Sequence, residues 1–261
     1  MSGFERRTIS GRVRALVSTD LERVGYLAAF VERGGGRSPP PFDSLNGSFG
    51  VGDAPELVAE NRGLLAQAFG LEAFPVPGFV HGTRLMPAGR GRIEDGYRTA
   101  PRAFATADGL HTKSRGMPLG AYSADCVIAI MASPTEGRVA LVHAGWRGLA
   151  SGVMQRAASL FGARREVRVA VGPAIGPCHY EVGADVALAV AAGSGAGAMT
   201  RRRGDRVFLD LVGTTRAVLR EQGIRRIWDT GECTACGRRR FFSYRRDGVT
   251  GRHMALGMRL K

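Results

Sequence analysis

Cys126 and His143 are the two residues whose types and positions most directly suggest chemistry. Cys126 lies within residues 121–130 and His143 within residues 139–148. Each stretch contains an apolar run with the length and composition of a buried strand. A thiol and an imidazole held on neighbouring strands can bind a metal ion, or they can act together as a nucleophile and its base. The two residues alone leave both kinds of chemistry open.

The neighbours of these two residues have less specific patterns. In a strand, Asp125 points to the opposite face from Cys126, so we expect it to bind a nearby loop rather than a metal ion. Trp146 and Arg147 follow His143 at a predicted strand-to-helix turn. Arg147 is suited to bind an anion there, but it is equally compatible with a solvated position in the first helical turn.

The elements that must position these residues alternate between strands and helices along the chain. Strands are expected at 12–18 and 24–32, within the runs 121–130 and 139–148, and at 167–171, 224–229, 241–244 and 254–260, and helices at 54–69, 147–161, 182–192 and 209–221. The first helix has Asp53 as its predicted N-cap and Gly70 just past its end. This interleaving predicts an α/β or α+β fold in which mixed β-sheets are layered with helices. Because no linker is long enough to separate two cores, residues 1–261 are expected to form a single domain.

The composition narrows the possible partners and compartments. The net charge is +14, and nearly all of it is arginine that is scattered along the chain, so coding bias explains it better than a nucleic-acid partner. Four cysteines are too few for a disulfide scaffold, and the first ten residues lack the apolar stretch of a signal peptide. With no apparent membrane span, we expect a cytoplasmic protein with reduced thiols.

Several short blocks in a fixed order suggest a specific family. They lie at residues 32–35, 44–46, 51–53, 60–62, 80–82, 124–126, 142–148, 172–178 and 241–248. In these blocks the chain resembles the family once named multicopper polyphenol oxidase or laccase-domain proteins, more recently described as purine nucleoside phosphorylases. The blocks cover most of the chain, so together they are far more specific than any one of them.

The resemblance implies a metal site and substrate contacts. The family's metal ligands correspond to His81, Cys126 and His143, which would also be the catalytic residues. This set suits zinc with one open position, where a water is acidified toward neutrality. Copper is the less favoured metal. The resemblance also assigns Asn46 and Arg62 to substrate binding, and we add Arg147 as a candidate anion contact. The competing interpretation is that Asn46 shapes its turn and that Arg62 lies on a solvated helix face.

Other features are less clear or depart from the family pattern. Phe79 replaces a usual glutamine and Ile128 a common proline, and neither change removes a metal ligand. Cys233 and Cys236 form a C-x2-C pair that Cys178 and His179 would complete as a second zinc site. A single C-x2-C pair is a weak signal, so we favour incidental buried thiols. Neither the oligomeric state nor the role of these cysteines follows from the sequence.

The leading function is a zinc enzyme that acts on purine nucleosides and phosphate. The resemblance implies phosphorolysis of adenosine, inosine, guanosine and methylthioadenosine, together with deamination of adenosine. The main alternative is a metal-free cysteine hydrolase with Cys126 as nucleophile and His143 as base. A multicopper oxidase is disfavoured because the five histidines lack His-x-His spacing. A basic nucleic-acid-binding module is a further alternative, which steep salt dependence of binding would support.

Overall fold

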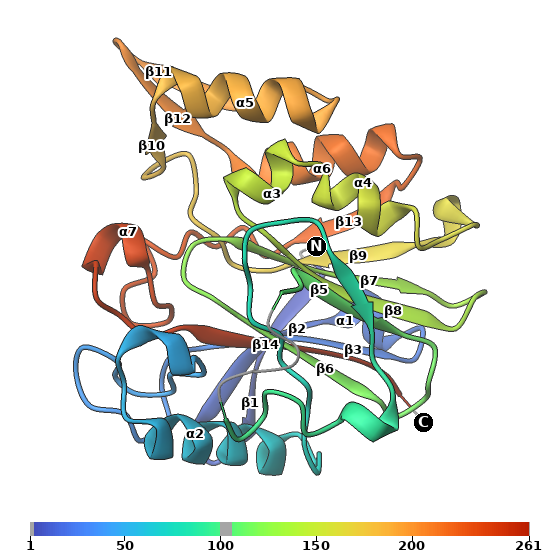
Figure 1. The fold of residues 1–261 in the computed structure, drawn as a ribbon, viewed down its shortest axis with the longest axis vertical. Coiled ribbons are helices and arrows are strands. Elements are labelled where there is room, and N and C mark those ends of the chain that lie inside the picture. The colour runs from blue at the N-terminus through green and yellow to red at the C-terminus, as the bar shows by residue number, and fades with distance from the viewer. Residues whose placement is uncertain (1–2, 100–105, 261) are drawn as a thin grey trace.

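Two β-sheets packed face to face, with helices on the outer side of each, form the body of the protein (Figure 1). The structure is a computed structural model that describes residues 3–99 and 106–260. The predicted fold class, mixed sheets layered with helices, is confirmed. None of the described helices is long and apolar enough to cross a membrane.

The first sheet has five strands, and every neighbouring pair in it is antiparallel. Its order is β1 (Phe4–Ser10), β2 (Val13–Ser18), β3 (Tyr26–Val31), β14 (His253–Arg259) and β6 (Pro118–Ser123). Helix α2 (Pro55–Ala68) covers the outer face of this sheet (Figure 1). Buried side chains of β2, β3, β14 and α2 pack together there.

The second sheet has six strands and carries most of the residues with candidate chemistry. Its order is β13 (Arg226–Asp229), β9 (Arg168–Val171), β7 (Val127–Ser133), β8 (Arg138–Ala144), β5 (Gly109–Thr112) and β4 (Leu85–Pro87). The edge pairs β13–β9 and β4–β5 are parallel, and the inner pairs are antiparallel. Helices α3 (Trp146–Ala150), α4 (Val153–Ala158) and α6 (Leu211–Glu221) cover the outer face (Figure 1).

Smaller elements complete the description. They are α1 (Thr19–Glu22), α5 (Ala184–Ser194), α7 (Tyr244–Asp247), a small sheet of β10 (Glu181–Val182), β12 (Arg206–Leu209) and β11 (Thr200–Arg203), and 3-10 turns at Phe49–Val51, Arg90–Arg92 and Arg164–Glu166. The small sheet and α5 lie beyond α3 and α6, at the end of the molecule away from α2 (Figure 1).

Strand β7 shows why the central strands are apolar at nearly every position. Val127, Ala129 and Met131 face the helices, whereas Ile128 and Ile130 face the first sheet. A strand that is buried on both faces needs apolar residues at consecutive positions, so the run alone does not reveal the two-residue period. This packing fixes the end of β7, where Cys126 lies.

Four local predictions need correction. Residues 121–130 are not one strand, because β6 and β7 belong to different sheets. The helix predicted at 147–161 is broken at Gly152, whose φ of 84° is left-handed. Residues 241–243 have irregular backbone that leads into α7, where Ser243 is the N-cap and Tyr244 the first helical residue, so 241–244 is not a strand. The N-cap residue of α2 is Ala54, which makes no side-chain cap hydrogen bond, whereas the carboxylate of the predicted cap Asp53 accepts from Ser38 and Asn46.

Candidate metal centre and its cavity

Three sequence-distant side chains converge at one end of the six-stranded sheet. His81 lies in the segment before β4, Cys126 in the turn before β7, and His143 near the end of β8. One ligand atom from each lies within 4.8 Å of the other two. Cys126 Sγ is 3.9 Å from His81 Nε2, and the two imidazole rings are 5.0 Å apart at 76°. We call these residues the three-donor cluster.

The spacing of the cluster suits a zinc ion. With Zn–S near 2.3 Å and Zn–N near 2.0–2.1 Å, sulfur and nitrogen ligands of a tetrahedron lie about 3.6 Å apart. The 3.9 Å between Cys126 Sγ and His81 Nε2 differs from that edge by a few tenths of an ångström. Gly145 permits this approach, because a Cβ there would lie 2.9 Å from both Cys126 Sγ and His81 Cδ2. Three donors leave one position open.

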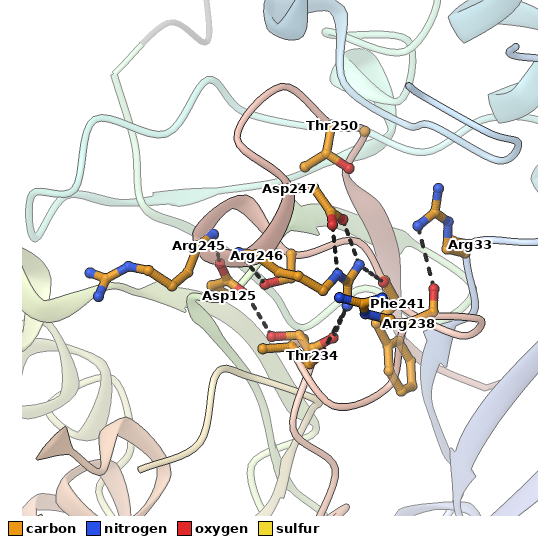
Figure 2. Close-up of polar contacts among 12 residues, drawn as sticks. Arg33, Asp125, Thr234, Arg238, Phe241, Arg245, Arg246, Asp247 and Thr250 are labelled. Carbon is orange, nitrogen blue, oxygen red and sulfur yellow. Dashed lines mark hydrogen bonds and ion pairs between the residues drawn. The ribbon is translucent and has the colours of Figure 1, made fainter. Parts of the chain in front are cut away.

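The turn that presents Cys126 is held by Asp125. Asp125 has a φ of 104°, a left-handed conformation that is uncommon for a non-glycine residue. Its carboxylate accepts hydrogen bonds from Thr234 Oγ1 at 2.6 Å and from the Arg245 backbone N–H at 2.7 Å (Figure 2). Asp125 therefore binds a nearby loop, as predicted, although it lies in a turn instead of a strand.

Asp108 organises both histidines and was not singled out from the sequence. Its side chain is fully buried, and one carboxylate oxygen lies 3.1 Å from His143 Nδ1. The two carboxylate oxygens also accept the backbone N–H groups of His81, at 2.8 Å, and Gly82, at 2.7 Å. A carboxylate behind a metal-binding imidazole fixes its tautomer and orientation, leaving Nε2 for the metal. In the sequence Asp108 is an acidic residue directly before the short strand Gly109–Thr112, whose only large apolar residue is Leu110.

The electrostatics of the cluster favour a thiolate beside a protonated imidazole when no metal is bound. Burial alone raises the pKa of the Cys126 thiol, but the adjacent His143 and His81 outweigh burial and lower this pKa to about 6. Burial alone lowers the pKa of His143, but Cys126 and Asp108 outweigh burial and raise this pKa to about 9. A metal ion would take the place of the proton between these groups.

A cavity of about 650 Å³ opens next to the three-donor cluster. This volume lies within the range of small-molecule sites. All three donors line the cavity, as do Arg147, Arg245, Arg252 and the aromatic side chains of Phe79, Tyr122, Trp146, Tyr180 and Tyr244. The cavity thus combines the metal-ligating groups with cations for an oxyanion and flat apolar faces for a planar ring.

Asn46 and Arg62 are not among the residues that line the cavity. Arg62 is 1% exposed, and its guanidinium donates to the backbone oxygens of Gly47, Gly96 and Tyr97. Asn46 is fully buried; it donates to Ser48 O and accepts from the backbone N–H groups of Ser48 and Arg252. Their described contacts stabilise the loop whose residues Ser48, Gly50 and Val51 form part of the cavity wall. Of the three predicted substrate contacts, the cavity includes Arg147.

Phe79, one of the departures from the family pattern, contacts a candidate ligand. Its ring stacks on that of His143 with 4.4 Å between centroids and 12° between planes. It also lies 4.9 Å from the ring of Tyr122. Phe79 therefore covers one face of the imidazole and makes this side of the cavity apolar.

The comparisons identify the family. Residues 27–259 match the family described as multi-copper polyphenol oxidoreductase laccase. The chain is 37% identical over 231 residues to purine nucleoside phosphorylase YfiH of Shigella flexneri, covering 87% of this chain and 91% of that protein. It is 38% identical over 235 residues to the purine nucleoside phosphorylase of Deinococcus radiodurans, covering 87% of each. The chain belongs to this family.

Solved structures agree with that assignment. The fold matches YlmD from Geobacillus stearothermophilus with a TM-score of 0.89 and 31% identity, covering 100% of each chain. It also matches a hypothetical protein YfiH from Bacillus licheniformis with a TM-score of 0.85 and 30% identity, covering 98% of this chain and 99% of that one. The predicted family resemblance is confirmed.

The described histidines do not assemble a multicopper centre. His81 and His143 share one cluster, whereas His111 lies beside Arg138 and His253 packs on Phe241. The fifth, His179, lies in a different cluster with three cysteines. Since a copper centre of several ions needs many imidazoles in one place, this arrangement offers too few.

Proposed function

We propose that this protein is a zinc-dependent enzyme of purine nucleosides, with His81, Cys126 and His143 as metal ligands. Its proposed reactions are phosphorolysis of adenosine, inosine, guanosine and methylthioadenosine, and deamination of adenosine. The observation that carries the proposal is a three-donor cluster that opens onto a cavity containing three arginines. The names of the relatives support the same reaction class.

Phosphorolysis requires a phosphate oxygen to attack C1′ of the ribose as the bond from C1′ to the purine breaks. Arg147, Arg245 and Arg252 line the cavity and are suited to bind that phosphate. Arg147 lies with its guanidinium carbon 4.6 Å from the centre of the Trp146 ring, which orients the guanidinium. We assign phosphate binding to these arginines, and we assign Asn46 and Arg62 to support of the loop.

The aromatic side chains of the cavity would position the purine. Tyr122 and Trp146 offer ring faces of a size suited to stacking on a planar base. Burial raises the pKa of Tyr180 to about 12, so its hydroxyl stays protonated near neutral pH and can donate a hydrogen bond to the base. When bound, zinc supplies a Lewis acid and lowers the pKa of water, which suits the attack of water on the purine ring in deamination.

One specific observation supports a second function, a metal-free cysteine hydrolase. The pKa of Cys126 is lowered and that of the neighbouring His143 is raised, which favours a thiolate beside a protonated imidazole. A cysteine nucleophile and its acid–base partner need this pair of charge states. The geometry of the cluster thus accommodates either a metal ion or a covalent mechanism. Loss of activity on metal removal separates the two.

The decisive experiment follows adenosine and inosine with and without phosphate, using native, chelator-treated and zinc-reconstituted protein. We expect ribose 1-phosphate to form only when phosphate is present, and adenosine to be converted to inosine even when phosphate is absent. Removal of the metal should abolish both activities. Full activity of metal-free protein, abolished by alkylation of Cys126, would instead support the hydrolase. Product identity by chromatography distinguishes phosphorolysis, hydrolysis and deamination.

A second experiment tests the phosphate contact. Replacing Arg147 by alanine removes a charge-assisted hydrogen bond, so we expect the KM for phosphate to rise about 10- to 100-fold. Arg201→Ala is the matched control, because it removes the same charge from β11, where all side chains are exposed. An unchanged KM in Arg147→Ala would remove Arg147 from the phosphate site.

A further inference from the structure

A second group of metal-ligating side chains lies outside the three-donor cluster. Cys178, His179, Cys233 and Cys236 each offer one ligand atom, and these four atoms lie within 4.8 Å of one another. We call them the four-donor cluster. The sequence favoured incidental buried thiols at these positions. In the structure Cys178 and Cys233 are half-buried and Cys236 is exposed, and side chains 54 to 58 residues apart meet at one point.

The sheet topology explains why they meet. Strands β9 and β13 are parallel neighbours, so the segments that follow them leave from the same edge of the sheet. Cys178 and His179 lie in the segment after β9, and Cys233 and Cys236 lie in the segment after β13. A bridge between Ala174 and Cys233 extends the parallel pairing beyond the strands and sets the register of the two segments.

The distances match the edges of a tetrahedron around zinc. With Zn–S near 2.3 Å, two sulfur ligands lie about 3.8 Å apart, and a sulfur and a nitrogen ligand lie about 3.6 Å apart. Cys178 Sγ is 3.7 Å from Cys236 Sγ. His179 Nδ1 is 3.2 Å from Cys178 Sγ, 3.5 Å from Cys236 Sγ and 3.9 Å from Cys233 Sγ. A disulfide needs its sulfurs at about 2.05 Å, and all four cysteines of the chain are free.

The surroundings of Cys233 favour a thiolate ligand. The backbone N–H of Gly176 donates to Cys233 Sγ at 3.3 Å, as expected for a sulfur that carries negative charge. A Cβ on Gly176 would lie 3.2 Å from Cys178 Sγ, so glycine leaves room for this sulfur. Arg206, Arg238, Arg245 and Arg246 line the hollow beside His179. Arg206 pairs with Glu181 and Arg246 with Asp247, so Arg238 and Arg245 supply most of the positive charge facing three thiolates, whose combined charge exceeds that of one zinc ion.

We propose that Cys178, His179, Cys233 and Cys236 form a second, structural zinc site with a complete Cys3His ligand set. Four protein ligands fill a tetrahedral ion, so this site has no open position for a reactant. The ion would join the segment after β9 to the segment after β13. Both segments reach the cavity, the first through Ile175 and Tyr180 and the second through Arg245.

The link to the cavity is direct, because Thr234 lies between the two cysteines of the C-x2-C pair. Its hydroxyl donates to Asp125, which precedes Cys126 of the three-donor cluster. Arg246 holds the same segment by donating to the backbone oxygens of Thr234, Ala235 and Phe241 (Figure 2). The second ion therefore acts as a positioning element for the wall that carries Asp125 and Arg245.

The test uses the fact that the chain has four cysteines, one in the three-donor cluster and three in the other. In full-length Cys126→Ala protein, every remaining thiol belongs to the four-donor cluster. We expect this variant to retain about one zinc per chain, and to give with Co²⁺ the visible absorption of a tetrahedral ion with thiolate charge transfer. The wild-type protein should hold about one equivalent more.

The controls separate a metal site from paired thiols and from misfolding. Adding Cys233→Ser and Cys236→Ser to Cys126→Ala should abolish the remaining zinc and the Co²⁺ spectrum. If that variant does not fold, chelator titration of the folded Cys126→Ala protein gives the same answer. The proposal is overturned if the folded Cys126→Ala protein binds no zinc or Co²⁺ under reducing conditions, or if its mass shows a disulfide in protein purified with reductant. Because no substrate is used, failure of the purine activity does not affect this result.

Discussion

The two His/Cys clusters lie at the same end of the six-stranded sheet but differ in the number of donors and in their surroundings. The three-donor cluster lines a cavity of about 650 Å³ and has a buried carboxylate, Asp108, behind its imidazoles. The four-donor cluster has three cysteines, and four arginines line the hollow beside its His179. Three ligands leave a position for a reactant, whereas four ligands complete the ion, so the donor count separates catalytic from structural chemistry.

Glycine backbone allows close approach of sulfur in both clusters. A Cβ on Gly145 would collide with Cys126 and His81, and a Cβ on Gly176 would press on Cys178. The Thr234–Asp125 hydrogen bond connects the two clusters. The proposed reactive site and its proposed support thus lie at one end of the sheet and are joined through Asp125, whose carboxylate accepts from Thr234 Oγ1 and whose backbone oxygen accepts from the Ile175 N–H.

The largest expected effect comes from removing a donor of the three-donor cluster. His81→Ala, Cys126→Ala or His143→Ala should each lower turnover about a thousandfold or more, because the Lewis acid contributes several kcal/mol to the transition state. Zinc content should fall by about one equivalent while the other is retained. Turnover and metal analysis of the same preparations check both. A variant with full activity would contradict the proposed ligand set.

The next effect is on stability and concerns the four-donor cluster. In the Cys126→Ala background, zinc at a thousand times its Kd should stabilise the fold by about 4 kcal/mol through mass action. Thermal unfolding at increasing free zinc measures this, and Cys233→Ser with Cys236→Ser should remove the dependence. A melting temperature of the Cys126→Ala protein that does not change with zinc would argue against a zinc site at the four-donor cluster.

Asp108→Asn should produce a smaller effect confined to the three-donor cluster. The asparagine amide keeps only one acceptor oxygen, so the hydrogen bond to either His143 or a backbone N–H is lost. We therefore expect metal affinity or activity to fall about 10- to 100-fold. Asp210→Asn is the matched control, because Asp210 caps α6 through Gly213 and an amide oxygen can still cap. Competition with a chelator measures affinity. If both variants had the same metal affinity, Asp108 would not orient the metal-binding imidazole.

Thr234→Val tests the contact between the clusters and should have the smallest effect. It leaves a buried oxygen of Asp125 without its donor, so we expect a stability loss of about 1 to 3 kcal/mol. Thr215→Val is the control, since Thr215 is fully buried and its hydroxyl has no hydrogen-bond partner among the described residues. Denaturant unfolding compares the two. Similar stabilities would mean that the clusters are not coupled through this bond.

Some of the local structure could be predicted from the sequence, and the physical reason is clear in each case. The α2 prediction at 54–69 differs from Pro55–Ala68 by one residue at each end, because helical spacing and Gly70 define the segment. The break at 124–126 was missed because β6 and β7 are both apolar, and a double-sided core hides the boundary. The N-cap of α2 was predicted wrongly because the Asp53 carboxylate accepts hydrogen bonds from Ser38 and Asn46, which folding brings next to it.

The sequence alone determined the chemistry available to this protein: which side chains can bind a metal, which blocks place the chain in its family, and the layered α and β composition. Only the tertiary structure decided which of those side chains meet. It joined Cys178 and His179 to Cys233 and Cys236, brought Asp108 behind His143, and left Asn46 and Arg62 away from the cavity. The reason is that strand pairing sets these distances, and pairing between segments far apart in the sequence leaves no periodic trace in either segment.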